Sequence, residues 1–249
     1  MLRLVAFDMD GTLVDVASSW GAVHAHYGLS NAGALARFLR DEIDDVEFIR
    51  SDVELWQARA PGIRREDLER ILAAVPLMPG ARELVAGLKE RGIRTAIVSG
   101  GIDLLAERLG RELGFDAVRA NGIRTRPDGT LTPEGIVRVP IKGKDRVLAE
   151  LQREFGVGVE ETASVGNSEI DIAMFRRSRI GIAFRPEDEA TRARATHVLE
   201  GPSLAEALPI LLSSDGSGPG RTDRTRSGGP PPPRQGIGRP GHGTPPADR

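Results

Sequence analysis

Apolar runs with strand character alternate along the chain with stretches of helical periodicity. Covering helices are predicted at residues 102–113, 145–155 and 170–177, and a hairpin at Asn121–Thr132 around Pro127-Asp128-Gly129. The predicted strands are Leu2–Phe7, Ile93–Val98, Ala117–Ala120, Thr162–Val165, Ile180–Phe184 and His197–Leu199. This alternation is typical of an α/β fold, in which helices cover both faces of a mostly parallel, Rossmann-like sheet.

The pattern changes between the first two strands, where residues 16–75 have purely helical periodicity. We interpret this segment as an all-helical cap, inserted after the first strand over a core formed by residues 1–15 and 76–212. Two apolar stripes at helical spacing run through it, over Val46, Ile49, Val53 and Trp56 and over Leu68, Ile71, Leu72 and Val75.

The end of the chain differs in composition from the rest. From Ser213 to Arg249 it holds nine Gly, eight Pro and six Arg, with Ile237 almost its only sizeable apolar residue. Such a segment cannot bury enough apolar surface to offset the entropy of ordering, so residues 213–249 are predicted to be a disordered tail. The net charge of −2 divides into +3 for this tail and −5 for the remainder, which argues against a nucleic-acid partner for the core.

Several classes of protein and site are excluded by what the sequence lacks. No run approaches 18 apolar residues and no signal peptide pattern opens the chain, so we expect a cytoplasmic protein without a membrane partner. The absence of cysteine excludes disulfides, thiolate catalysis and Cys-ligated zinc. His24 and His26 cannot share a helix face, so we expect no metal site there.

Two carboxylates follow the first predicted strand, in the stretch Asp8-Met9-Asp10-Gly11-Thr12-Leu13. In an open α/β sheet, ligands bind just beyond the carboxyl ends of the strands, where a carboxylate can ligate a metal or act as a nucleophile. An Asp-rich turn or a fragment of a calcium loop would also explain the motif, so by itself it leaves both interpretations open.

A second motif, Ser99-Gly100-Gly101, follows the second predicted strand and is expected to open a helix. A hydroxyl and free backbone N–H groups at a helix N-terminus suit a phosphate. An ordinary N-cap with a flexible turn is the alternative interpretation.

Lysine is rare in this chain, because only Lys89, Lys142 and Lys144 among its 34 basic residues are lysine. Two lysines flanking one glycine suggest that a compact ammonium is needed, as in a point contact with a phosphoryl oxygen. A solvated helix start is the alternative.

The last motif begins where the strand Thr162–Val165 runs into Gly166-Asn167, and Asp171 follows four residues later. The motifs lie 91 residues apart from Asp8 to Ser99, then 45 to Lys144 and 23 to Asn167. Their order and spacing resemble the phosphoserine phosphatase branch of the haloacid dehalogenase superfamily, over nearly all of residues 1–212. The resemblance implies a hydrolase of phosphomonoesters with a helical cap in the same place.

Carried onto this chain, the family's mechanism implies that Asp8 attacks phosphorus to form an aspartyl-phosphate, while Asp10 protonates the departing alcohol. Ser99 and Lys144 would be the other catalytic residues. The implied cofactor is Mg²⁺, with the ligands Asp8, Asp10, Asn167 and Asp171. The implied partner is a small phosphomonoester, in contact with Gly11, Thr12, Ser99, Gly100, Lys144 and Asp52.

Three positions depart from the family's pattern. Asn167 stands where the fourth motif usually has an aspartate, so the metal ligand there is uncharged. Ala17 and Asp52 stand where phosphoserine phosphatases bind their substrate with a glutamate and a cap arginine. We therefore expect that free phosphoserine is not preferred, and that a hydroxyl-rich leaving group, a sugar or polyol, suits Ser18, Ser19 and Asp52. Phosphate transfer to a second alcohol and non-catalytic binding of a phospho-ligand remain open alternatives.

Overall fold

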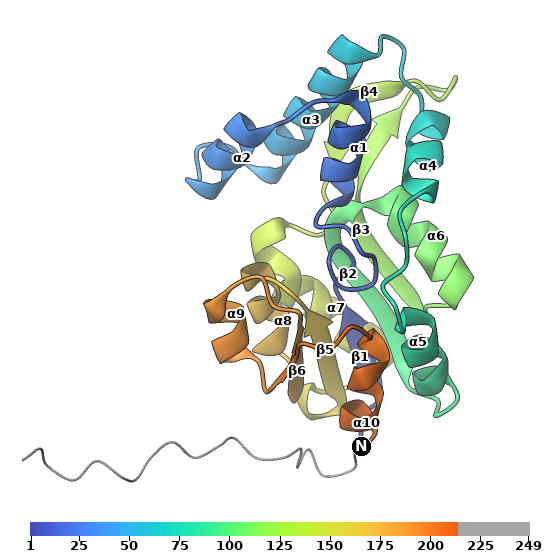
Figure 1. Cartoon of the computed structure of the whole chain (residues 1–249), viewed down its shortest axis with the longest axis vertical. Helices are drawn as coiled ribbons and strands as arrows, with labels where there is room; N and C mark the ends of the chain where they lie inside the picture. Colours follow the sequence, from blue (N-terminus) through green and yellow to red (C-terminus); the bar gives the residue numbers. More distant parts are fainter. Residues whose placement is uncertain (214–249) are drawn as a thin grey trace, which may run out of the picture. The chain divides into compact units, whose positions relative to one another are not determined.

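The computed structural model describes residues 1–213, which form a seven-stranded sheet flanked by helices (Figure 1). The strand order is β4-β3-β2-β1-β5-β6-β7, and all neighbours are parallel except β3 and β4. The predicted α/β fold is thereby confirmed, whereas the predicted tail lies outside the described residues apart from Ser213. The strands are β1 (Leu4–Phe7), β2 (Arg94–Ile102), β3 (Ala117–Thr125), β4 (Leu131–Ile136), β5 (Thr162–Gly166), β6 (Ile180–Phe184) and β7 (His197–Leu199).

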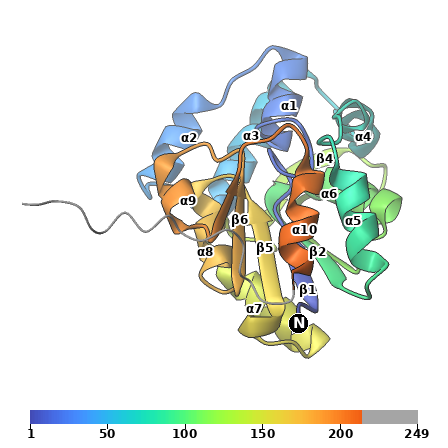
Figure 2. The ribbon, with the colours of Figure 1, turned by 60° about the horizontal axis from the view of Figure 1, so that its bottom comes forward.

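Side chains of β1 alternate between the two faces of the sheet, as a strand buried on both sides requires. Val5 and Phe7 belong to one hydrophobic cluster, and Leu4 and Ala6 belong to another. In Figure 2, α5 and α10 lie on one side of the strands and α8 and α9 on the other. The first cluster is covered by α5 (Ala81–Lys89), α6 (Asp103–Leu113) and α10 (Ala207–Leu212), and the second by α7 (Lys144–Phe155) and α8 (Ile172–Phe175), while α9 (Glu189–Arg194) follows β6.

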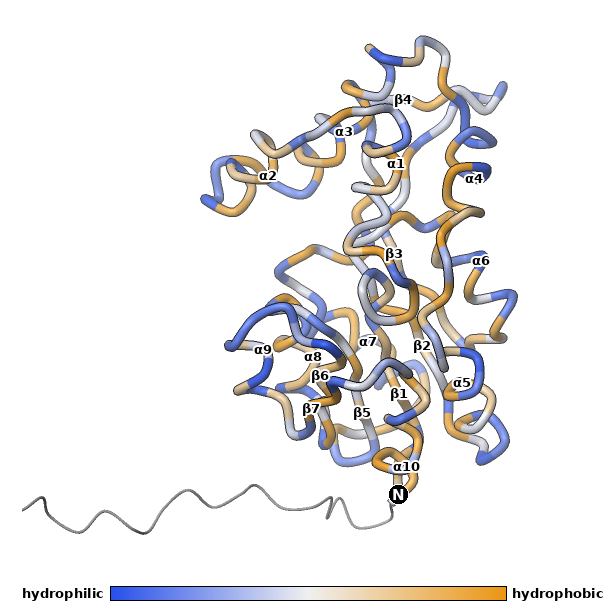
Figure 3. The backbone as a smooth tube through the Cα atoms, in the orientation of Figure 1, coloured by the Kyte–Doolittle hydropathy of each residue, from blue (hydrophilic) through white to orange (hydrophobic). Residues whose placement is uncertain are grey.

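Four helices fill the segment between β1 and α5: α1 (Ser19–Tyr27), α2 (Ala32–Leu39), α3 (Asp45–Arg59) and α4 (Arg65–Ala73). Figure 3 shows apolar and polar positions alternating around them. The predicted apolar stripes are buried or half-buried, except that Val46 is 38% exposed. No helix within residues 1–213 is both long and apolar enough to cross a membrane.

The predicted hairpin exists, but it is longer than the sequence suggested. β3 continues to Thr125 instead of ending at Ala120, and β4 pairs with it in antiparallel register. The turn is the predicted one, because Arg126 N donates to Thr130 O at 2.8 Å and Gly129 has a φ of 87°.

This hairpin packs against the helical segment. Gln57 Nε2 on α3 donates to Leu131 O at 2.8 Å, and Leu131 N donates to Ile63 O at 3.0 Å. Strands from the core therefore support α3, although the regular elements within residues 16–75 are all helices, as predicted. The interpretation of this segment as a cap stays a prediction. The hydrogen bonds join residues far apart in sequence, which helical periodicity alone does not reveal.

The second strand also differs from its prediction. β2 runs through Ser99-Gly100-Gly101 to Ile102, and α6 begins only at Asp103. Ser99 therefore lies in extended chain at the end of a strand, not at a helix N-terminus as expected.

Candidate active site

Asp8 follows directly on β1, at the edge of the sheet where the parallel strands end. Its backbone N–H donates to Val165 O at 2.9 Å, and its Oδ1 accepts from Lys144 Nζ at 2.6 Å. Burial and the neighbouring carboxylate of Asp171 raise the pKa of Asp8 from 3.8 to about 7, although Lys144 partly offsets them. The carboxylate is thus held in place in a site where negative charge is poorly compensated.

Lys144 is the first residue of α7 and is 3% exposed. Its Nζ donates to Asp8 Oδ1 and, at 2.7 Å, to Asp171 Oδ1. Burial alone would lower the pKa of Lys144, but the attraction of Asp171 and Asp8 outweighs it and raises the pKa. The side chain is therefore an ammonium fixed beside Asp8.

Asp171, which the resemblance offered as a metal ligand, has both carboxylate oxygens occupied by protein donors. Oδ1 accepts from Lys144, and Oδ2 accepts from Asn167 N at 3.0 Å and Ser168 N at 3.1 Å. Asp171 therefore orients Lys144 and the loop after β5, and its role as a metal ligand stays a prediction.

Asp10 has one oxygen engaged and one without a partner. Oδ2 accepts from both Ser19 N and Ser19 Oγ at 2.8 Å. Oδ1 is buried and has no hydrogen-bond partner among the described residues. Burial raises the pKa of Asp10, and the two hydrogen bonds from Ser19 counteract this in part. A carboxyl that is protonated more readily than usual, with a free oxygen, can deliver a proton.

Ser19 makes contacts at the site that the sequence did not predict. It is fully buried, and its Oγ also accepts from Ile102 N at 3.0 Å, so it ties α1 to the end of β2 as well as to Asp10. Gly101 makes this approach possible, since a Cβ there would lie 2.6–2.8 Å from Met9 Cε, Ser19 Oγ and Asp10 Oδ2.

Asn167 lies between the first motif and a carboxylate that the sequence reasoning missed. Its Nδ2 donates to Glu187 Oε1 at 3.0 Å, and its Oδ1 accepts from Thr12 Oγ1 at 3.4 Å. Gly11, with a φ of 72°, packs so closely on the Asn167 side chain that a Cβ would overlap it. Gly11 and Thr12 therefore shape the position of Asn167, and neither lines the cavity described next.

A cavity of about 620 Å³ opens between these residues and the helices α1, α2 and α3. Asp8, Asp10, Ser99, Gly100 and Lys144 form its floor. Ser99 Oγ accepts from Gly101 N at 3.1 Å, so its own proton remains available for an anion. Much of the remaining lining is apolar or aromatic and includes Ala17, Trp20, Ala25, Leu29, Ala32, Leu35, Phe48, Ile141 and Ile170.

The predicted substrate residue Asp52 lines the same cavity from α3. Its Oδ1 lies 2.7 Å from His24 Nε2 and accepts from Asn31 Nδ2 at 2.6 Å. His24 in turn accepts from Trp56 Nε1 at 3.1 Å through Nδ1. His24 thereby links Trp56 to Asp52 through its two ring nitrogens.

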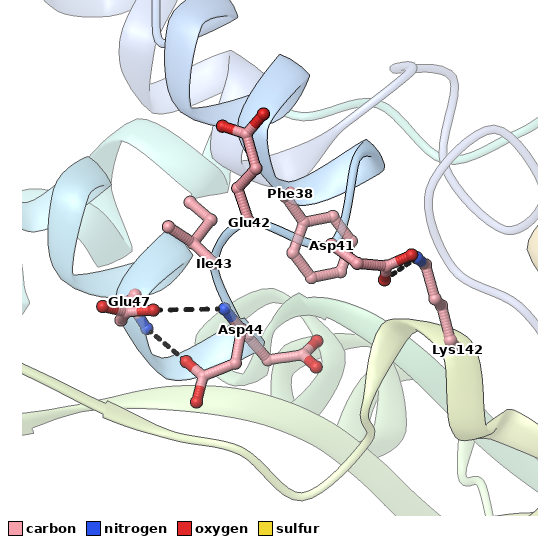
Figure 4. A pocket seen from close by; sticks show the side chains of 8 residues that line it. Phe38, Asp41, Glu42, Ile43, Asp44, Glu47 and Lys142 are labelled. Atoms are coloured by element: carbon pink, nitrogen blue, oxygen red, sulfur yellow. Dashed lines mark hydrogen bonds and ion pairs between the residues drawn. The ribbon is translucent and has the colours of Figure 1, made fainter.

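Lys142, the second lysine of the motif, lies outside this site. It pairs with Asp41 in the turn between α2 and α3, and its Nζ lies 5.6 Å from the centre of the Phe38 ring (Figure 4). These residues line a separate hollow of about 310 Å³. Nearby, Asp45 Oδ1 accepts from Ile141 N at 2.9 Å, so two contacts connect the turn with the loop before α7.

The oxygen donors around the cavity floor fit a divalent cation. Asp8, Asp10 and Asn167 offer carboxylate and amide oxygens, which are the ligands that Mg²⁺ prefers in proteins. Within residues 1–213, no group of three His, Asp or Glu side chains that could hold a metal ion is found, and Asn167 itself does not line the cavity. The raised pKa of Asp8 and the unpaired Oδ1 of Asp10 mark negative charge that a cation would neutralise.

Comparison with known proteins agrees with this geometry. A family model for haloacid dehalogenase-like hydrolases matches residues 5–176. The phosphoserine phosphatase of Idiomarina loihiensis is 32% identical over 216 residues, which cover 85% of this chain and 94% of that protein. A phosphoserine phosphatase of Archaeoglobus fulgidus is 35% identical over 188 residues, 75% of this chain and 53% of that protein, so the chain spans about half the length of this relative.

A solved structure described as the phospho-aspartyl intermediate analogue of phosphoserine phosphatase superposes with a TM-score of 0.71. It is 25% identical, and the match covers 84% of this chain and 99% of that one. The chain therefore belongs to the haloacid dehalogenase-like hydrolases. Within that family it is similar to the phosphoserine phosphatases, which confirms the resemblance read from its motifs and the expectation of a phosphatase-type enzyme.

Proposed function

We propose that the chain is an Mg²⁺-dependent hydrolase of small phosphomonoesters that works through an aspartyl-phosphate on Asp8. The observation that carries this proposal is the fixed carboxylate of Asp8 at the end of β1. Lys144 holds its Oδ1 at 2.6 Å, whereas no described residue donates a hydrogen bond to Oδ2. Oδ2 is the oxygen available to attack phosphorus.

In the first step, Asp8 Oδ2 forms a bond to phosphorus while the bond from phosphorus to the alcohol oxygen breaks. The departing oxygen takes the proton of Asp10, whose raised pKa favours the protonated form. In the second step, Asp10 accepts a proton from water, and the resulting hydroxide attacks phosphorus and releases the Asp8 carboxylate. Lys144 and the hydroxyl of Ser99 stabilise charge on the phosphoryl oxygens.

When bound, Mg²⁺ would reduce the repulsion between Asp8 and the substrate phosphate. Asp8, Asp10 and the Oδ1 of Asn167 would hold it. Glu187 supports this arrangement because it accepts from Asn167 Nδ2 and so orients the amide, which leaves Oδ1 with only the long contact to Thr12 Oγ1 and a lone pair for a cation.

Phosphate release from 4-nitrophenyl phosphate, with and without Mg²⁺, tests the proposal. Asp8→Asn should abolish turnover, and Asp10→Asn should reduce it by about 10²- to 10⁴-fold, as expected for loss of a general acid–base. Asp15→Asn is a matched control, since Asp15 is exposed and outside the cavity. Full activity of Asp8→Asn would contradict the mechanism. Phosphate that appears only on an added alcohol would instead identify a phosphotransferase, and binding without turnover would identify a non-catalytic protein.

A further inference from the structure

The cavity lining on the side of α3 includes a carboxylate, and no lysine or arginine of the lining lies free to neutralise it. Asp52 lines the cavity and is only 2% exposed. The cavity lining contains no arginine, and Lys144 is its one lysine. That ammonium is already held by Asp8 and Asp171, so it is not available to balance Asp52.

His24 donates to Asp52 without neutralising it. The indole N–H of Trp56 points at His24 Nδ1, and an indole nitrogen can only donate. Nδ1 must therefore accept, which leaves the single ring proton on Nε2, facing Asp52 Oδ1. In this arrangement His24 gives Asp52 a single hydrogen bond, and no lysine or arginine among the described residues pairs with this carboxylate.

Asp52 has one oxygen left for a ligand. Oδ1 accepts from His24 and Asn31, whereas no described residue donates to Oδ2. A buried carboxylate with a free oxygen favours a cationic donor from the ligand, because an unpaired buried charge is costly. Trp20 and Phe48 line the same cavity, and aromatic ring faces attract ammonium groups.

We infer that the leaving group is an amino alcohol, so that the substrate carries an ammonium group for Asp52 and no carboxylate. This inference rests on the proposed phosphatase function and adds its substrate class. A carboxylate on the substrate would find no free cation in the cavity lining, and it would be repelled by Asp52.

This leaving group differs from the hydroxyl-rich one expected from the sequence, for which Ser18 and Asp52 line the cavity but Ser19 does not. Ser19 is fully buried and bonded to Asp10, so it cannot contact the leaving group. A sugar or polyol also lacks the positive charge that would balance Asp52, and it would face a mostly apolar wall.

Three matched phosphomonoesters test the inference on the full chain with Mg²⁺. O-phosphoethanolamine carries only the ammonium, O-phosphoserine adds a carboxylate, and 2-hydroxyethyl phosphate replaces the ammonium by a hydroxyl. The kcat/KM for O-phosphoethanolamine should exceed each of the others by about tenfold or more, because like-charge contacts and unpaired buried charges cost several kcal/mol. Asp52→Asn should remove its advantage over 2-hydroxyethyl phosphate by raising KM. Glu54→Gln, on the exposed side of α3, should keep the ranking.

A higher kcat/KM for O-phosphoserine or 2-hydroxyethyl phosphate would overturn the inference, as would an unchanged ranking in a folded Asp52→Asn protein. Melting curves establish whether that variant is folded. If the Asp52→Asn protein is not folded, the order of kcat/KM values of the unaltered chain for the three compounds is the test of the inference. If the chain hydrolyses none of the three phosphomonoesters and does not hydrolyse 4-nitrophenyl phosphate either, the proposed function itself is contradicted.

Discussion

Lys142 and Lys144 are separated by one glycine, yet their surroundings give them different roles. Lys144 is buried between two carboxylates, whereas Lys142 is exposed and pairs with Asp41. The rarity of lysine identified both residues, but it could not separate them. The direction of each side chain is set by the turn at Ile141–Gly143 and by the residues that meet it, and composition carries no information about either.

Single polar residues that act through others were the hardest to predict. Ser19 and Glu187 belong to no short motif. Each contacts a residue far away in the sequence, Ile102 for Ser19 and Asn167 for Glu187, so only the folded chain brings the partners together. Asn167 was identified because it departs from the family's fourth motif, but its partner Glu187 was not identified. The neighbouring carboxylate can be found only when β6 places the chain after Phe184 beside the loop after β5.

The pair of Asn167 and Glu187 gives a prediction for metal affinity. Glu187→Gln should weaken Mg²⁺ binding by about 10-fold, the usual loss when a residue that orients a metal ligand is changed. Asn167→Asp should tighten it, because a charged oxygen replaces a neutral one. In the Asn167→Asp background, Glu187→Gln should have a smaller effect, because a carboxylate at position 167 has no amide hydrogen for Glu187 to orient.

Calorimetric titration of Mg²⁺ into the substrate-free protein measures these affinities without reference to activity. Glu169→Gln is a suitable control, because Glu169 is exposed and lies two residues from Asn167. Equal affinities in all the variants would show that residue 167 does not hold the cation.

At the scale of elements, strands and helices with a strong hydrophobic period were predictable. β1, β5, β6 and β7 agree with the predicted strands to within a residue or two. The ends of β2 and β3 were not predictable, because glycines and an asparagine interrupt the apolar pattern there. Contacts distant in sequence extend these strands, such as the hydrogen bond from Ile102 N to Ser19 Oγ.

Gly101 is the point where β2, α1 and Asp10 meet most closely, and it gives a prediction for stability. Gly101→Ala should lower the free energy of unfolding by about 1–3 kcal/mol, the range for overpacking a filled site. It should also reduce turnover by displacing Asp10 or Ser19. Gly33→Ala is the control: Gly33 lies in α2 with open space where a Cβ would go, so alanine should stabilise by about 0.5–1 kcal/mol. Chemical denaturation of both variants measures the difference, and a neutral Gly101→Ala would contradict this description of the packing.

At the scale of the whole molecule, the topology brings together motifs that the sequence spreads over 160 residues, from Asp8 to Asn167. Their convergence was predictable, because the carboxyl ends of β1, β2 and β5 meet at one edge of a parallel sheet. The charge of the assembled cavity was not predictable. It depends on which acidic side chains the helices α1–α3 present to it, and on the absence of arginine from its lining.

The accumulation of carboxylates predicts how stability depends on pH. The pKa of Asp8 is raised to about 7 in the folded protein, from 3.8, so between these values the folded state keeps a proton that the unfolded state has released. The protonated Asp8 therefore costs no stability below pH 4, and the free energy of unfolding falls as the pH rises from 4 toward 7. Without metal, the melting temperature of the unaltered protein should fall relative to that of Asp8→Asn across this range.

Magnesium should reverse this loss, because it binds the deprotonated carboxylates. Saturating Mg²⁺ should raise the melting temperature more at pH 8 than at pH 5, where protons compete for Asp8 and Asp10. At a concentration 100-fold above Kd, the expected gain is about 2.7 kcal/mol. Asp8→Asn should gain much less at either pH. Thermal denaturation with and without Mg²⁺ measures these differences. An equal gain in melting temperature at both pH values would contradict cation binding at Asp8 and Asp10, the carboxylates whose pKa is raised.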